Sequence, residues 1–333
     1  FVASFIDDRY APGGERLLEP AAALLGELIC DPVTYHGRFV PEYFESEKTN
    51  LLEAIRSLIN DKRDWADSRL LRALCDGEAY AVPRLGDEET VDKLQALKVY
   101  TQYRDLISTA PLEIIYSGSA DLERVKQALA AAFATLPREE VRVISTAAPH
   151  VCRESVQYVE DVLDVTQGKL GMGFSCGSDD MPALLMGNTL FGGSSNSKLF
   201  LNVREKLSLC YYASSLYHRQ KGLITVSSGI EFQNYQRAYD EIMAQLEAVQ
   251  KGELEDWELE GARSTLLNSY ATVGDSQGKL ENFYLGQAAT GQHETPADLA
   301  RAIQDMTAER ICRAMSTVKL DTVYFLKGKE AEA

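Results

Sequence analysis

The sequence is poor in histidine. It has four histidines, His36, His150, His218 and His293, and no two of them are four positions apart. Neither H-x-x-E-H nor H-E-x-x-H, with which a helix binds a catalytic zinc ion, therefore occurs. The His293-Glu294 pair lies in a predicted loop, and we interpret it as two neighbouring polar residues. The sequence also has no Walker A pattern and no G-x-S-x-G elbow, so it gives no sign of nucleotide hydrolysis or of serine catalysis.

Basic side chains are outnumbered as well. The 333 residues include 34 Lys and Arg against 50 Asp and Glu, for a net charge of −16. We therefore expect no nucleic-acid partner, because such a partner would need a basic face. No apolar run approaches the ~20 residues of a membrane span, so we also expect no span.

Paired cysteines are absent too. The six cysteines, Cys30, Cys75, Cys152, Cys176, Cys210 and Cys312, are scattered and form no C-x-x-C. This pattern predicts reduced, mostly buried thiols in a cytoplasmic protein, without a disulfide framework or a zinc knuckle.

Apolar periodicity and turn residues predict an α+β fold in two domains. Strands are expected at 1–6, 112–118, 155–163, 169–174, 209–216, 223–230 and 322–326, and helices between them. Residues 1–140 would form the first domain, 141–154 a linker and 155–333 the second domain. Each domain is predicted to have a mainly antiparallel sheet with helices on one face.

The two halves end alike, which predicts that the domains are homologous. Each has a long helix, a second helix that ends at a glycine (Gly77, Gly291), a proline-containing loop, two short helices and a strand that ends in glycine. The chain begins at Phe1, already inside a predicted strand. We therefore expect the first domain to lack its N-terminal part, and the uncovered apolar surface to favour a homo- or heterodimer.

The most informative stretch is 190–215, L-F-G-G-S-S-N-S-K-L-F-L-N-V-R-E-K-L-S-L-C-Y-Y-A-S-S. A Gly-Gly turn leads into a helix with Leu199, Val203 and Leu207 on one face, and an aromatic-rich strand follows. Arg204 lies on this helix and Tyr211 begins the strand. Both are therefore expected where the two elements meet.

This stretch resembles the second-half motif G-G-S-S-N-S-K-L-F-x-x-V-R-E-K-x-x-L-x-Y of the pitrilysin/insulinase-like metallopeptidases. These are inverzincins, which include the subunits of mitochondrial processing peptidase. The resemblance continues more weakly along nearly the whole chain. It implies that Arg204 and Tyr211 reach toward substrate held at the zinc site of the first domain. Tyr212 would point to the opposite face, because side chains alternate along a strand.

The resemblance also identifies the place of the zinc ligand that follows H-x-x-E-H. Residues 44–55, F-E-S-E-K-T-N-L-L-E-A-I, match the family segment F-E-x-E-K-x-x-x-L-x-E-I. The ligand position falls on Ala54, whose methyl cannot bind a cation, and Glu47 matches the supporting acidic residue. A shift of the alignment by one residue would instead use Glu53. The sequence thus predicts a degenerate zinc site, no catalytic residue and no metal cofactor.

Three functions remain open at this point. The first is a peptide-binding subunit, similar to zinc-less bacterial homologues, that acts with a zinc-bearing homologous partner in proteolytic processing. The second is an active zinc metalloendopeptidase whose H-x-x-E-H precedes Phe1, in which case zinc would be its cofactor. The third is a purely structural subunit. Retention of Arg204 and Tyr211 favours the first.

Overall fold

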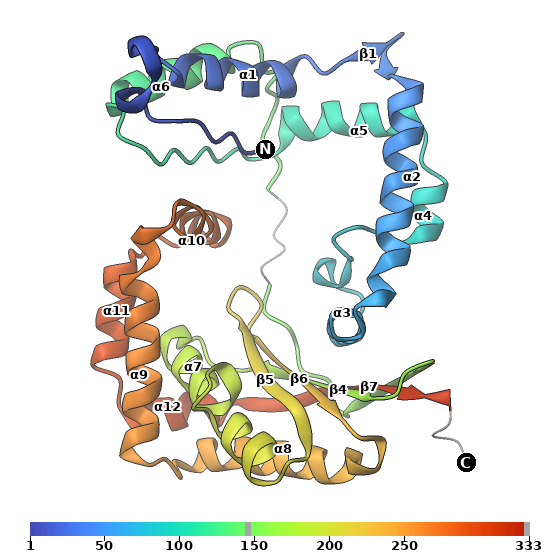
Figure 1. Ribbon diagram of the computed structural model, residues 1–333, viewed down its shortest axis with the longest axis vertical. Coiled ribbons are helices and arrows are strands. Elements are labelled where there is room, and N and C mark those ends of the chain that lie inside the picture. The colour runs from blue at the N-terminus through green and yellow to red at the C-terminus, as the bar shows by residue number, and fades with distance from the viewer. Residues whose placement is uncertain (144–147, 330–333) are drawn as a thin grey trace. The chain divides into compact units, whose positions relative to one another are not determined.

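The computed structural model describes residues 1–143 and 148–329, and the predicted α+β class is confirmed (Figure 1). The chain divides into two compact units. The first comprises Phe1–Arg56 and Leu85–Ser145, and the second comprises Ser57–Arg84 and Thr146–Ala333. Of the predicted linker 141–154, residues 144–147 lie outside the described residues. The segment 57–84 groups with the second unit, although the predicted first domain covers residues 1–140. The predicted domain limits therefore remain a prediction.

The second unit is built on a five-stranded mixed sheet of order β3-β7-β4-β6-β5 (Figure 1). Its strands are β3 (Gln157–Leu163), β4 (Gly168–Cys176), β5 (Cys210–His218), β6 (Leu223–Ile230) and β7 (Val318–Gly328). Only the β3–β7 pair is parallel, and the other neighbours are antiparallel. Four of these strands match the predicted segments closely, and β7 is longer than predicted.

One face of this sheet packs against the larger share of the helices. Leu170, Met172 and Phe174 alternate along β4 and are buried with Ile242 and Leu246 of α8. The helical elements are α7 (Met181–Asn188), the π-helical η5 (Thr189–Gly193) and η6 (Leu199–Lys206), α8 (Tyr235–Lys251), α9 (Asp256–Ala271), α10 (Gln277–Thr290), α11 (Pro296–Gln304) and α12 (Ala308–Met315).

The other face of the sheet is covered by α3 (Lys62–Leu74). Leu70 and Leu74 of α3 are almost fully buried. A Cβ at Gly173 would lie 2.7 Å from Leu74 Cδ2, and one at Gly171 would lie 3.2 Å from Leu70 Cδ2. The two glycines therefore let the helix approach the strand closely. The segment Gly171-Met172-Gly173 therefore serves close helix–strand packing.

The first unit is mainly helical. It contains α1 (Leu18–Cys30), α2 (Pro41–Ser57, of which Ser57 falls in the second unit), α4 (Glu88–Asp92), α5 (Ala96–Thr109), α6 (Leu122–Ala132) and a short hairpin, β1 (Thr34–Tyr35) with β2 (Arg38–Phe39). Leu18, Ala22, Val125 and Ala128 form a small core between α1 and α6. Beside this core, Arg124 pairs with both Asp8 and Glu19 at 2.6 Å.

Two predicted strands of the first unit are wrong. Residues 1–6 and 112–118 are assigned neither to a helix nor to a strand, and their apolar side chains, such as Phe1, Leu112 and Ile114, are exposed. A strand requires a neighbour for its backbone groups, and neither segment pairs with another in the described chain. Among the described residues, no helix is both long and apolar enough to cross a bilayer.

Candidate functional site

Arg204 is positioned by the π-helical segment η6. Leu199 and Val203 of η6 are fully buried in the core, which fixes the inward face of the segment. Arg204 follows Val203 and is only partly buried, with 40% of its side chain exposed. Its guanidinium lies 4.8 Å from the centre of the Phe200 ring and 3.5 Å from the carboxylate of Glu205. The predicted inward position of Leu207 is wrong, because Leu207 lies just past the end of η6 and is exposed.

Tyr211 lies at a β-bulge at the start of β5. Cys210 pairs with Ile230 and Tyr212 with Gly229, so Tyr211 is an extra residue between two consecutive partners. Bulges of this kind redirect a side chain and are common beside functional sites. The Tyr211 side chain is exposed, and its hydroxyl donates a hydrogen bond to Glu231 at the end of β6. This bond to a carboxylate raises the pKa of Tyr211.

Arg204 and Tyr211 line the same surface pocket, which has a volume of about 430 Å³. The pocket also contains Glu205, Ser208 and Glu231. Ser208 joins η6 to β5 and has a φ of 50°, in the left-handed region that non-glycine residues rarely adopt. This turn brings the chain from the helix into the strand within a few residues, which places the two predicted residues together.

Tyr212 has a different environment. Its ring lies 4.4 Å from the Arg63 guanidinium of α3 and 5.6 Å from Lys169 Nζ. A Cβ at Gly229 would come within 2.5 Å of the ring, so the glycine leaves room for it. Arg63 also donates a hydrogen bond of 3.1 Å to Ser214. Tyr212 therefore helps attach α3 to the sheet and does not line the pocket of Arg204 and Tyr211.

Glu47 and Ala54 both lie on α2 and are seven residues apart, so they share one face of that helix. Glu47 is exposed and Ala54 is partly buried. The methyl of Ala54 offers no lone pair, and no group of three potential ligands occurs on α2 in the described chain. These residues do not fit the zinc ion of the pitrilysin-like peptidases.

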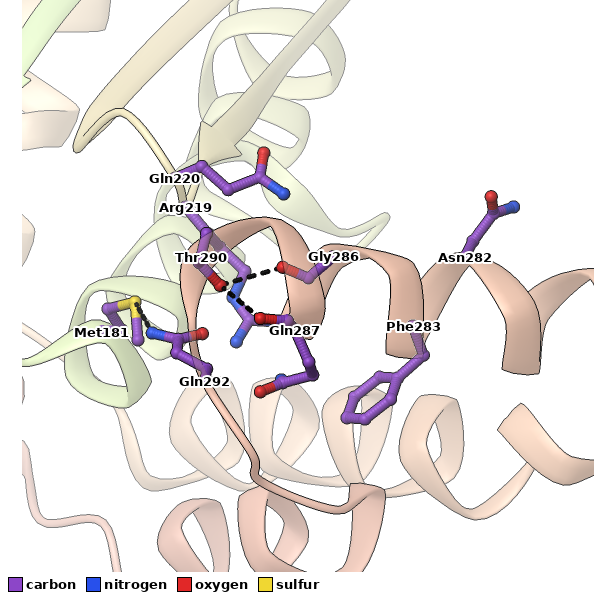
Figure 2. A pocket seen from close by; sticks show the side chains of 9 residues that line it. All are labelled: Met181, Arg219, Gln220, Asn282, Phe283, Gly286, Gln287, Thr290 and Gln292. Atoms are coloured by element: carbon purple, nitrogen blue, oxygen red, sulfur yellow. Dashed lines mark hydrogen bonds between the residues drawn. The ribbon is translucent and has the colours of Figure 1, made fainter. Parts of the chain in front are cut away.

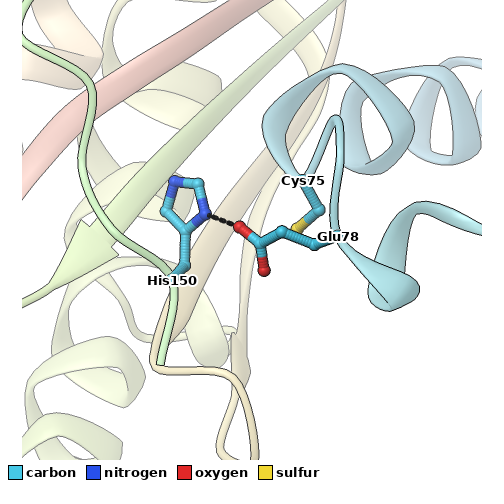
Figure 3. A group of neighbouring side chains, drawn as sticks. All are labelled: Cys75, Glu78 and His150. Atoms are coloured by element: carbon cyan, nitrogen blue, oxygen red, sulfur yellow. Dashed lines mark hydrogen bonds and ion pairs between the residues drawn. The ribbon is translucent and has the colours of Figure 1, made fainter. Parts of the chain in front are cut away.

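One group of potential ligands does occur, away from α2. Cys75, Glu78 and His150 bring a thiol, a carboxylate and an imidazole within 4.8 Å of one another (Figure 3). His150 Nδ1 lies 2.6 Å from Glu78 Oε1, and His150 Nε2 lies 3.1 Å from Asp321 Oδ2. Burial raises the pKa of the Cys75 thiol to about 11. No sequence pattern indicated this group, because His150 lies 72 residues after Glu78 in the sequence.

The charges in this group are already compensated. Lys221 pairs with Glu78, and Arg153 donates to Asp321 and to the backbone carbonyls of Ala73 and Leu74. Asp321, Lys221 and His150 are all nearly inaccessible to solvent. The group is therefore best described as a buried ion-pair network that joins the end of α3 to β7 and to the β5–β6 turn.

The sequence reasoning missed Glu231 as the partner of Tyr211. A signal was present, because the predicted strands 209–216 and 223–230 are consecutive and would pair as a hairpin. Antiparallel pairing brings the start of the first strand close to the end of the second, where Glu231 lies.

Comparison with known proteins identifies the family to which this fold belongs. A family model described as "Peptidase M16 inactive domain" matches residues 93–266. The chain is 34% identical over 331 residues to the "Probable inactive metalloprotease YmfF" of Bacillus subtilis, covering 97% of this chain and 76% of that protein. The chain therefore belongs to the peptidase M16 family, and the predicted resemblance to the pitrilysin-like peptidases is confirmed.

Solved structures share this fold. A conserved protein from Enterococcus faecalis V583 superposes with a TM-score of 0.86 at 25% identity, covering 98% of this chain and 78% of that one. The peptidase M16 inactive domain from Pseudomonas fluorescens gives a TM-score of 0.76 at 17% identity, covering 93% and 75%. The second likeness supports the fold alone.

Proposed function

We propose that this protein is a non-catalytic peptidase M16 homologue that binds peptide through Arg204 and Tyr211. We further propose that it acts in the cytoplasm with a zinc-bearing homologous subunit in proteolytic processing. The observation that carries the proposal is that the two side chains line one surface pocket although seven positions separate them in the sequence. The methyl of Ala54 at the expected ligand position supports a non-catalytic role.

The chemistry of the pocket suits an extended peptide. Arg204 offers several N–H donors with a fixed planar geometry, and these can bind peptide carbonyl groups. The Tyr211 hydroxyl donates its proton to Glu231, which leaves its oxygen able to accept a hydrogen bond from a peptide amide. Glu205 and Glu231 add negative charge, which favours a peptide with a basic residue nearby.

Binding of fluorescent unfolded peptides tests the proposal. Arg204→Ala and Tyr211→Phe should each weaken affinity, because each removes at least one hydrogen bond of about 0.5–1.5 kcal/mol, and more for the charged donor. The expected change is about three- to tenfold in Kd. If a zinc-bearing partner is identified, partner-dependent cleavage should fall in parallel.

Matched variants separate binding from stability. Lys206→Ala removes a neighbouring exposed cation of η6 that does not line the pocket, and Tyr10→Phe removes the hydroxyl of an exposed tyrosine in the first unit. Both controls should bind peptide like the wild type. A lower melting temperature with unchanged affinity per folded molecule in the Arg204 and Tyr211 variants would instead assign the pair a structural role.

A further inference from the structure

A second pocket lies in the same unit, at the C-terminal end of α10 (Figure 2). It has a volume of about 330 Å³ and is lined by residues of α10, by Met181 of α7 and by Arg219 and Gln220 of the β5–β6 turn. Its lining contains four amide side chains and one guanidinium, and no carboxylate. The lining therefore combines a single positive charge with amide groups that can each donate and accept hydrogen bonds.

Arg219 carries that charge and is partly buried. It makes no ion pair and no side-chain hydrogen bond with the residues that the structure describes. A guanidinium has five N–H donors, and a half-buried one is normally satisfied by a carboxylate or by carbonyl groups. The donors of Arg219 are thus available on the pocket side, between Gln287 and Gln292 in Figure 2.

Gln287 adds a donor whose direction is fixed. Its side chain is 5% exposed, and its Oε1 accepts a hydrogen bond of 3.2 Å from the backbone N–H of Glu294. Because a backbone N–H can only donate, the amide oxygen must face Glu294 and Nε2 must point elsewhere. Nε2 has no hydrogen-bond partner in the described chain and is not sealed from solvent, so this amide donor can reach a ligand in the pocket.

The surrounding backbone holds this arrangement in place. Gly291 ends α10 with a φ of 66°, and the N–H of Gln292 returns to the carbonyl of Gln287 at 2.9 Å. The Thr290 hydroxyl donates to Gly286 O at 2.8 Å, and Gln292 Nε2 contacts Met181 Sδ at 3.4 Å. The helix end that carries Gln287 is therefore held in one conformation, which lowers the entropic cost of binding there.

We propose that this pocket binds the carboxylate group of a peptide, presented either by its C-terminus or by an acidic side chain. A carboxylate carries one negative charge and accepts several hydrogen bonds, which matches one guanidinium and the neighbouring amide donors. A phosphate dianion would leave about one charge uncompensated. The ring of Phe283 gives the wall an apolar part for the adjoining residue. This pocket is separate from that of Arg204 and Tyr211, and the proposal does not depend on it.

Fluorescence anisotropy with the full chain tests the proposal and distinguishes the two sources of the carboxylate. The first probe is an N-terminally labelled hexapeptide of neutral residues with a free C-terminal carboxylate. The second is its C-terminal amide, and the third is the amide with one internal glutamate. The acid or the glutamate peptide should bind at least tenfold more tightly than the neutral amide. Equal binding of all three probes, or no binding of any, would overturn the proposal.

Variants locate the effect. Arg219→Met should abolish the preference for the carboxylate peptide, and Gln220→Glu, an exposed change that introduces a like charge at the rim, should lower affinity at least tenfold. Arg237→Met, at an exposed arginine of α8, is the control and should leave the preference intact. The same preference should survive Arg204→Ala. If Arg204→Ala loses the preference for the carboxylate peptide and Arg219→Met keeps it, carboxylate binding belongs to the pocket of Arg204 and Tyr211, and the inference is refuted.

Discussion

Single residues decide which of two adjacent tyrosines reaches the pocket. Regular alternation alone would already place Tyr211 and Tyr212 on opposite faces of β5. The bulge adds a second effect, since it leaves Tyr211 without a cross-strand partner, while Tyr212 packs opposite Gly229 under Arg63. The left-handed Ser208, three residues earlier, turns the chain into this bulge at a cost in conformational energy.

Replacing Ser208 with glycine should stabilise the protein. A left-handed conformation costs a residue with a side chain about 1–2 kcal/mol, and the greater freedom of glycine in the unfolded chain offsets part of the gain. We expect an increase in the free energy of unfolding of about 0.5–1 kcal/mol, measured by urea denaturation. Ser208→Ala retains the strained conformation and should show no increase. A gain of equal size in both variants would contradict this account.

At the scale of elements, α3 is the clearest case of packing that the sequence did not reveal. The helix was predicted correctly, but its partner is a sheet whose strands begin about eighty residues later in the chain. Leu70 and Leu74 fill the space above the two glycines of β4, and the buried network around Asp321 holds the end of the helix.

Truncation of Leu74 should therefore be costly. Leu74→Ala removes a fully buried side chain beside Gly173, where no Cβ is available to fill the space. We expect a loss of about 2–5 kcal/mol in the free energy of unfolding. Arg72→Ala changes an exposed residue of the same helix and should stay within about 0.5 kcal/mol of the wild type. If the two variants lose similar amounts of unfolding free energy, the packing of Leu74 against the sheet does not contribute as described.

The pairing of α1 and α6 should depend on pH. Hydrogen bonds from Arg124 lower the pKa of Glu19 to about 2. A lowered carboxylate pKa means that the stabilisation is complete above about pH 4.5 and is lost as the pH falls toward 2. Because 39% of the Glu19 side chain is exposed, we expect this ion pair to contribute no more than about 1 kcal/mol to the free energy of unfolding.

Melting temperatures from circular dichroism between pH 6 and pH 2 measure this effect. The difference between the wild type and Glu19→Gln should be largest at pH 6 and should shrink toward pH 2. Glu27→Gln alters an exposed carboxylate of the same helix and should show no such trend. A difference that is constant with pH would mean that Glu19 does not act through its charge.

At the scale of the whole molecule, the described chain keeps the fold of the family, while the predicted degenerate zinc site remains a prediction. The five-stranded sheet, the helical first unit and a pocket lined by Arg204 and Tyr211 are present, and the α2 position predicted to match the zinc ligand is Ala54. The only group of three potential ligands in the described residues, Cys75 with Glu78 and His150, is already neutralised by Lys221 and Arg153.

We therefore expect well under one zinc ion per chain after exhaustive dialysis against a chelator and then buffer. Inductively coupled plasma mass spectrometry on the purified chain measures the number of zinc ions per chain. One tightly held zinc ion would contradict the expectation, and Cys75→Ser would then show which site is responsible. If Cys75→Ser loses the zinc ion, the ion was bound by the buried network. If the variant keeps it, the zinc site is expected on α2.

The sequence by itself determined the fold class, most helices and the strands of the second unit. These follow from local periodicity and from turn residues, and the second unit supplies a neighbour for each of its predicted strands. The sequence also predicted that Arg204 and Tyr211 would lie close together, because both belong to one contiguous motif of helix, turn and strand, and they line one pocket.

Only the tertiary structure decided the rest. It showed that residues 1–6 and 112–118 form no strands, because pairing depends on a neighbour that local pattern does not specify. It brought Glu231 to Tyr211, α3 to the second unit's sheet, and Arg219 to Gln287 across about seventy residues of chain. Such contacts join segments that are distant in the sequence, and burial, charge compensation and hydrogen bonding are properties of the folded arrangement and not of any single stretch.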